Sequence, residues 1–206
     1  MWPVIIDFGN VSLFDKEFHL AIYSYGFMLV VAFYSCFFLL SKDLKRLGHE
    51  SKLASDIIFA AAVGGIVGSK IYYLLESLDK VIEDPMGMIF SGSGLVFLGG
   101  LMGGTLGVTY VIRKNQLHWL SFGDIVAPLL ILGYSIGRIG CFLVGDDYGL
   151  PTKMPWGMSF ENGLPPTTYS VFERAYPWVD LAGFTDGLIK VHPTQPMETI
   201  ICFLIF

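Results

Sequence analysis

Residues 125–144 (IVAPLLILGYSIGRIGCFLV) form an apolar run long enough to cross a bilayer, and Arg138 is the only charged residue in it. A guanidinium inside a membrane span costs at least about 2.5 kcal/mol by insertion scales, so such a residue normally faces a polar cavity and pairs with an anion. In a membrane, the abundant anion that suits a fork of five donors is a lipid phosphate. Arg138 therefore predicts a protein that handles phospholipid, and a structural ion pair with Asp146 or Glu198 is the alternative.

The composition agrees with a membrane location and excludes several classes of partner. Of the 206 residues, 53% are hydrophobic and 15% are charged, whereas soluble domains carry about 25% charged residues. The net charge of −5 and the lack of a basic run argue against nucleic acid as a partner. The cysteines Cys36, Cys141 and Cys202 lie in apolar stretches and lack the spacing of a metal or redox site. We therefore expect no metal and no cofactor.

Four apolar runs have the length of a membrane-spanning helix, which is about 20 residues. They cover approximately residues 19–40, 53–75, 95–112 and 125–144. A fifth begins near Glu198 and is cut off at Phe206, so we expect an incomplete span and a chain truncated at its C-terminus. The prediction is an all-α fold, a polytopic integral membrane helical bundle that forms a single transmembrane domain over residues 1–206.

The charges of the connecting loops predict the orientation of the chain. The basic residues of the first and third loops are Lys42, Lys45, Arg46, Lys52, Arg113 and Lys114, and the acids of the second loop are Glu76, Asp79, Glu83 and Asp84. Basic loops stay on the cytoplasmic side. The N-terminus and the second loop are then predicted to lie outside. Residues 145–192 form an extracytoplasmic loop region, or cap, on the same side.

Glycines spaced four residues apart line single helix faces in the second and third spans. They are Gly64 and Gly68 in the second, and Gly99, Gly103 and Gly107 in the third. Small residues at this spacing let two helix backbones approach closely in lipid, where no hydrophobic force drives helices together. We expect close helix contact along these faces.

Three polar motifs fall at the outer side in this topology. They are residues 137–152 (GRIGCFLVGDDYGLPT), residues 192–199 (HPTQPMET) and residues 23–26 (YSYG). The topology was derived from lysines, arginines and loop acids alone, so the convergence of the three motifs on one side is independent support for a site there.

At these motifs the chain resembles the phosphatidylglycerol–prolipoprotein diacylglyceryl transferase family. The resemblance is carried by SYG, the LGGLMGG of the third span, GRIGCF with the following G and YG, PWGM, and HPTQ. It implies a seven-span fold in the bacterial cytoplasmic (inner) membrane, with about two spans beyond Phe206. It also implies transfer of diacylglycerol from phosphatidylglycerol to the lipobox cysteine of a preprolipoprotein, with release of glycerol phosphate. The implied partners are phosphatidylglycerol, the lipobox peptide and membrane lipids.

The resemblance also implies roles for individual residues. Arg138 matches the arginine thought to hold the lipid phosphate, and Lys70 replaces another arginine, so Lys70 either assists or snorkels to the headgroups. Asp146 takes the place of a common glutamate, and His192 matches a histidine of the family. The other matching positions, taken as substrate-binding, are Tyr25, Gly140, Gly145, Gly149 and Gln195.

The implied chemistry needs a base, because a cysteine thiol is mostly protonated at neutral pH. His192, Asp146 and Glu198 are the candidates for this catalytic role, and His192 has the most suitable unperturbed pKa. Two further positions depart from the family, since Leu98 stands where a histidine is usual and Met197 where a tyrosine is usual. The alternative function is therefore a catalytically inactive relative that binds lipid as a structural subunit of a larger membrane complex.

Overall fold

The computed structural model describes residues 2–13, 16–90 and 96–206. The chain divides into two compact units. The first unit comprises Met1–Ser35 and Leu130–Phe206, and the second comprises Cys36–Leu129. Each unit is described by itself below.

The described residues are mostly helical, which confirms the predicted helical membrane bundle. The longer helices are α1 (Ser24–Arg46), α2 (Ser51–Glu76), α5 (Phe97–Lys114) and α6 (Trp119–Val144). The shorter helices are α3 (Leu78–Glu83), α4 (Pro85–Phe90), α7 (Tyr169–Ala175) and α8 (Thr194–Ile205). In the described part of the chain, α1, α2 and α6 are long and apolar enough to cross a membrane.

A β-hairpin precedes the first helix, and the all-α prediction did not include it. Strand β1 (Val4–Leu13) pairs antiparallel with β2 (Lys16–Tyr23), so the helix expected from residue 19 begins at Ser24. The reason is visible in residues 16–23 (KEFHLAIY), where apolar residues alternate with the two-residue period of a strand. Gly9 lies at an irregularity of β1 with φ of +76°, a conformation that favours glycine.

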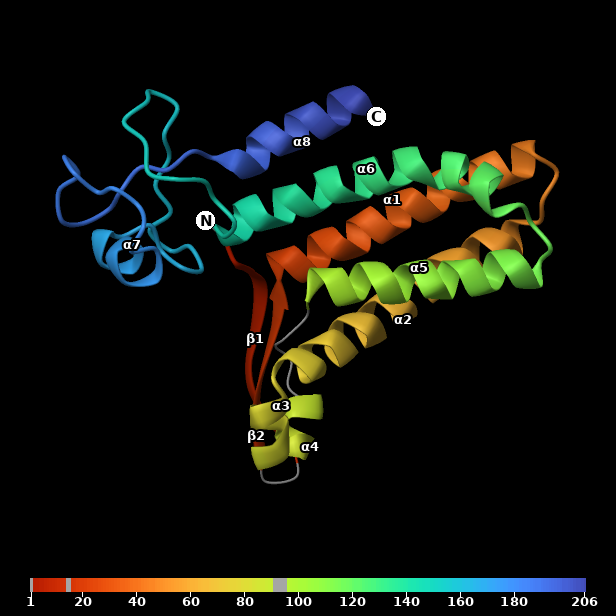
Figure 1. Cartoon of the computed structure of the whole chain (residues 1–206), viewed down its shortest axis with the longest axis horizontal. Coiled ribbons are helices and arrows are strands. Elements are labelled where there is room, and N and C mark those ends of the chain that lie inside the picture. Colours follow the sequence, from red (N-terminus) through yellow and green to blue (C-terminus); the bar gives the residue numbers. More distant parts are fainter. Residues whose placement is uncertain (1, 14–15, 91–95) are drawn as a thin grey trace. The chain divides into compact units, whose positions relative to one another are not determined.

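In the second unit, α2 and α5 lie side by side and pack through their glycines (Figure 1). A methyl group built at Gly64, Gly68, Gly99 or Gly103 would overlap atoms of the facing helix. This contact confirms the close packing predicted from the glycine spacing. The buried core of the unit draws on four helices and includes Leu40, Leu44, Ile57, Ile112, Phe122 and Leu129.

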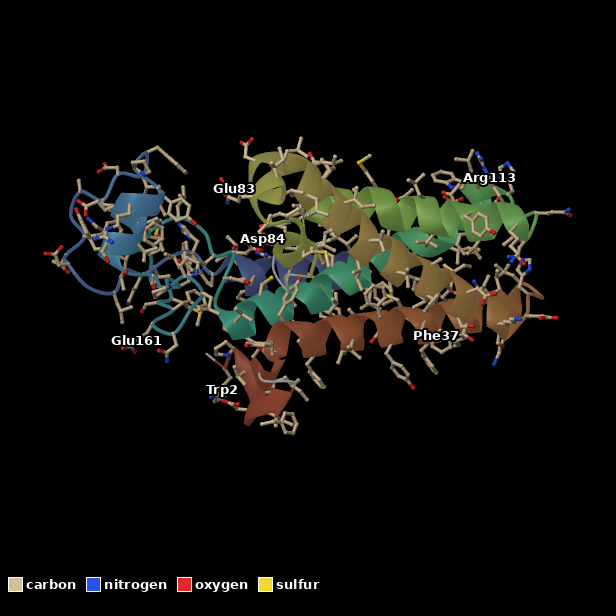
Figure 2. The ribbon with its side chains drawn as sticks, turned by 90° about the horizontal axis from the view of Figure 1, so that it is seen from below. Trp2, Phe37, Glu83, Asp84, Arg113 and Glu161 are labelled. Atoms are coloured by element: carbon tan, nitrogen blue, oxygen red, sulfur yellow. The ribbon has the colours of Figure 1, made fainter. Side chains whose placement is uncertain are left out.

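The charged loops of the second unit lie at its opposite ends. Figure 2 shows Arg113 at one end of α5, and Glu83 and Asp84 toward the other end of the helix pair. This separation of basic and acidic loops is the arrangement on which the predicted orientation depends.

In the first unit, α8 lies along the C-terminal half of α6 (Figure 1). The Ser135 hydroxyl donates to the Thr199 carbonyl at 3.1 Å, and the Thr199 hydroxyl donates to the Ser135 carbonyl at 3.4 Å. Reciprocal bonds of this kind hold two helices together in lipid. They fix the face of α6 that α8 covers.

Residues 145–193 connect these two helices and contain the predicted cap (residues 145–192), which folds around an apolar core of its own. The core consists of Phe160, Phe172, Ile189 and Val191, all at most 2% exposed. The Tyr148 ring stacks on Phe160 with ring centroids 5.5 Å apart. Burial raises the pKa of Tyr148 to about 12, so its hydroxyl stays neutral and donates to a carbonyl. The cap is thus a packed module anchored to α6 and α8.

Candidate functional site around Arg138

Arg138 lies near the C-terminal end of α6 and is only 9% exposed. Its Nη1 atom is 3.2 Å from Asp147 Oδ2, and its Nε atom is 3.0 Å from Glu198 Oε2. The expected ion pair with Glu198 is therefore present. Asp146, which the same alternative also named, is not the partner, because the neighbouring Asp147 supplies the second carboxylate.

The turn after α6 explains why Asp147 is the partner. Gly145 has φ of +77°, and the N–H groups of Gly145 and Asp146 both donate to the Cys141 carbonyl, at 2.8 and 3.2 Å. These bonds combine the αL and Schellman patterns of helix ending, both of which favour glycine at the left-handed position. Asp147 is also left-handed, with φ of +50°. The chain consequently turns back, which brings the Asp147 carboxylate to Arg138.

The Asp147 carbonyl joins the guanidinium to the start of α8. Arg138 Nη2 donates to this oxygen at 3.1 Å, and the Thr194 hydroxyl donates to it at 2.8 Å. Nη2 also lies 3.4 Å from the Thr194 hydroxyl oxygen. Bonds to a charged donor are stronger than neutral ones. Arg138 therefore fixes the loop and the helix start around itself.

Glu198 is engaged by more than one donor. The Tyr134 hydroxyl donates to Glu198 Oε2, the oxygen that Arg138 Nε also contacts. Arg138 Nη2 lies 3.4 Å from the other oxygen, Oε1. These contacts suit Glu198 to orient Arg138.

His192 is held by the cap, through the indole of Trp156. Trp156 Nε1 donates to His192 Nδ1 at 3.1 Å. A neutral imidazole that accepts at Nδ1 carries its proton on Nε2. In this arrangement His192 Nε2 is a possible hydrogen-bond donor and is not the atom that would take a proton.

Gln195 and Asp146 pack together at the start of α8. Gln195 is completely buried, and its Nε2 donates to the backbone carbonyl of Asp146. Burial, with a smaller contribution from the charge of Asp147, raises the pKa of the Asp146 carboxyl. Asp146 Oδ1 is buried and has no hydrogen-bond partner among the described residues. Burial therefore disfavours the ionised form of this carboxyl.

The three glycines expected to bind substrate occupy places where another backbone or side chain comes close. A methyl group at Gly140 would lie 3.2 Å from Tyr25 Cδ2, which brings Tyr25 of α1 to the same face of α6. A methyl group at Gly149 would lie 2.9 Å from the Thr194 side chain. These contacts at Gly140 and Gly149, and the left-handed turn at Gly145, explain why each of the three positions favours glycine.

Three further residues from the sequence analysis take no part in these contacts: Lys70 and Leu98, which belong to the second unit, and Met197. Lys70 belongs to α2 in the second unit, where its Nζ is 5.5 Å from the ring centroid of Tyr73. Leu98 is on α5 in the same unit and is exposed. Met197 is on α8, beside Glu198, and is exposed. A role for Lys70 in phosphate binding stays a prediction.

Comparison with known proteins identifies the family. The sequence profile described as prolipoprotein diacylglyceryl transferase matches residues 12–206. The chain belongs to this family. A phosphatidylglycerol–prolipoprotein diacylglyceryl transferase of Clostridium tetani (strain Massachusetts / E88) is 31% identical over 188 residues, which are 91% of this chain and 68% of that protein. One from Shewanella sp. (strain ANA-3) is 34% identical over 167 residues, 79% of this chain and 62% of that protein. The chain thus spans about two thirds of their length, and with its apolar helices it is an integral membrane protein.

Within this diacylglyceryl transferase family member, four contact residues of the site were missed from the sequence. They are Tyr134, Asp147, Trp156 and Thr194. Tyr134 had a signal, because it lies four residues before Arg138 and so on the same face of α6. Trp156 had none, since its bond to His192 spans 36 residues of an irregular loop.

A thiol and two acids also gather beside the guanidinium. The ligand atoms of Cys141, Asp146 and Asp147 lie within 4.8 Å of one another. Asp147 Oδ2 is already paired with Arg138, whose positive charge would oppose a metal ion at the same place. We assign no metal to this cluster.

Proposed function

We propose that the protein transfers diacylglycerol from phosphatidylglycerol to the lipobox cysteine of preprolipoproteins. The observation that carries the proposal is a nearly buried guanidinium, Arg138, whose two acidic partners are accessible. The names of the relatives from Clostridium tetani and Shewanella support the same substrates.

The ion pairs of Arg138 leave a route for a lipid phosphate. The Asp147 side chain is 71% exposed, so it can turn into water and leave Nη1 to a phosphate oxygen. Exposed ion pairs contribute only about 0–1 kcal/mol, so the exchange costs little on the side of Asp147. A phosphate takes two parallel bonds from one guanidinium, which makes it the stronger partner.

The reaction then follows from the position of the positive charge. A base removes the thiol proton of the lipobox cysteine. The thiolate then attacks the carbon of the diacylglycerol unit that bears the phosphate ester. A carbon–sulfur bond forms, the carbon–oxygen bond breaks, and glycerol phosphate leaves with the electron pair. Arg138 stabilises the charge that develops on the leaving phosphate. A share of this stabilisation by Lys70 is an expectation from the family resemblance alone.

Of the three candidates for the base, the contacts favour Asp146. His192 offers a donor at Nε2, and Glu198 is held by Tyr134 and Arg138. Asp146 has an unpartnered oxygen within the described residues, and burial raises its carboxyl pKa, which brings it closer to that of a thiol. Gln195 and the close contact at Gly149 then serve to position the segment that carries Asp146, with Tyr25 of α1 beside Gly140.

A transfer assay tests the function. The purified full-length protein should convert a lipobox peptide to its diacylglyceryl form with phosphatidylglycerol and give no product with phosphatidylcholine. The measurement is the mass of the peptide, read with time. An inactive wild-type protein that still binds phosphatidylglycerol would instead favour the alternative, a lipid-binding structural subunit of a membrane complex, which rests on Leu98 and Met197.

The proposed location is the bacterial inner membrane, with the N-terminus and the cap outside. The separation of Arg113 from Glu83 and Asp84 supports this orientation (Figure 2). A protease site inserted after Asn115 should resist protease added to intact spheroplasts, and the same site after Glu161 in the cap should be cut. Cleavage after Asn115 with protection after Glu161 would reverse the orientation.

A further inference from the structure

Tyr134 is a contact of the site that neither the motifs nor the proposed reaction assigns. It lies on α6 four residues before Arg138, so the two side chains share a helix face. Its hydroxyl donates to Glu198 Oε2 on α8. The Tyr134 side chain is half-exposed, whereas Arg138 is buried. The phenol thus approaches Glu198 from the accessible side.

Glu198 therefore connects two donors of different strength. Arg138 Nε lies 3.0 Å from Oε2, which also accepts from the Tyr134 hydroxyl. A phosphate that binds the guanidinium competes with Glu198 for the N–H donors of Arg138. Without the Tyr134 hydroxyl, a carboxylate that lost Arg138 to the phosphate would be an uncompensated charge next to a membrane span, which is strongly unfavourable.

We propose that Tyr134 is a positioning residue that holds Glu198 while a lipid phosphate replaces this carboxylate at Arg138. This inference rests on the proposed function, because it assumes that Arg138 receives the phosphate. In the free protein, Tyr134 shares Glu198 with the guanidinium. In the lipid-bound protein, its hydroxyl is the donor that remains. Tyr134 therefore stabilises the bound state more than the free state and strengthens lipid binding.

A double-mutant cycle tests this coupling. The probe is short-chain phosphatidylglycerol, titrated calorimetrically into the full-length protein in detergent. Tyr134→Phe should weaken binding about tenfold, the value expected for loss of one hydrogen bond to a charged group. In the Glu198→Gln background, where no charge is stranded, the same change should alter Kd by less than about twofold. Tyr110→Phe, an exposed hydroxyl deletion on α5, is the matched control and should leave Kd unchanged.

The outcomes separate the inference from the function on which it rests. Equal weakening by Tyr134→Phe in both backgrounds would mean a general structural effect and would overturn the inference. An unchanged Kd in the Tyr134→Phe variant would also overturn it, while binding that still depends on Arg138 would leave the proposed function standing. Phosphatidylglycerol binding that is indifferent to Arg138→Ala would remove both. Thermal unfolding of each variant confirms that folded proteins are compared.

Discussion

Replacement of Arg138 by alanine is expected to reduce diacylglyceryl transfer at least about 100-fold, the loss typical of removing one charge-stabilising donor from an active site. The guanidinium is buried and contacts both Asp147 and Glu198. Among the described residues of the first unit, no other cation contacts these two acids, so none is placed to replace Arg138. Arg138→Lys should restore only part of the rate, because an ammonium cannot offer the planar pair of donors. The measurement is the initial rate of transfer to a lipobox peptide.

The control for this experiment is Arg174→Ala, which removes an exposed arginine of α7 in the cap and should leave the rate unchanged. The binding of phosphatidylglycerol to Arg138→Ala should weaken together with the rate. Clear turnover by Arg138→Ala would contradict the mechanism, because the leaving phosphate would then need no guanidinium.

Replacement of Gly103 by alanine should destabilise the second unit by about 3 kcal/mol, the upper end of the range typical of overpacking. The new methyl group would lie 2.8 Å from the Gly68 Cα atom and closer still to the Gly64 carbonyl, and neither is a side chain that can move aside. The helices α2 and α5 would have to separate along their whole contact. We expect a large drop in Tm in detergent.

Gly123→Ala is the matched control, since it makes the same change in α6 of the same unit. A methyl group at Gly123 meets no atom within 4 Å. Alanine is a better helix former than glycine by about 1 kcal/mol, so this variant should be as stable as the wild type or slightly more stable. Similar Tm values for the two variants would show that the glycine contact does not hold the helices together.

The sequence allowed prediction of features that repeat along a helix. The glycine faces of α2 and α5 follow from a spacing of four, and the buried Arg138 follows from an apolar run of known length. The hairpin of β1 and β2 was missed because its alternating apolar residues merge with the apolar start of α1. A composition window of membrane-spanning length averages over that alternation.

The partners within the site were harder to predict, because they depend on loop conformation. Asp146 and Asp147 are adjacent acids of one residue type, and only the left-handed turn at Gly145 decides which of them reaches Arg138. The bond from Trp156 to His192 depends on the fold of the cap, and no local pattern in the sequence encodes it. Residue types were therefore readable from the sequence, but their pairing was not.

The ion pairs of Arg138 also have an order in time, because a ribosome makes the chain from its N-terminus. Glu198 lies 60 residues after Arg138, whereas Asp147 lies only 9 residues after it. During synthesis, α6 therefore meets the bilayer before α8 exists, and the guanidinium needs a counter-ion at that stage. Asp147 is the acid that can serve first, and Glu198 joins when α8 docks. The exposed carboxylate of Asp147 therefore compensates the charge of Arg138 until α8 has been synthesised and has docked.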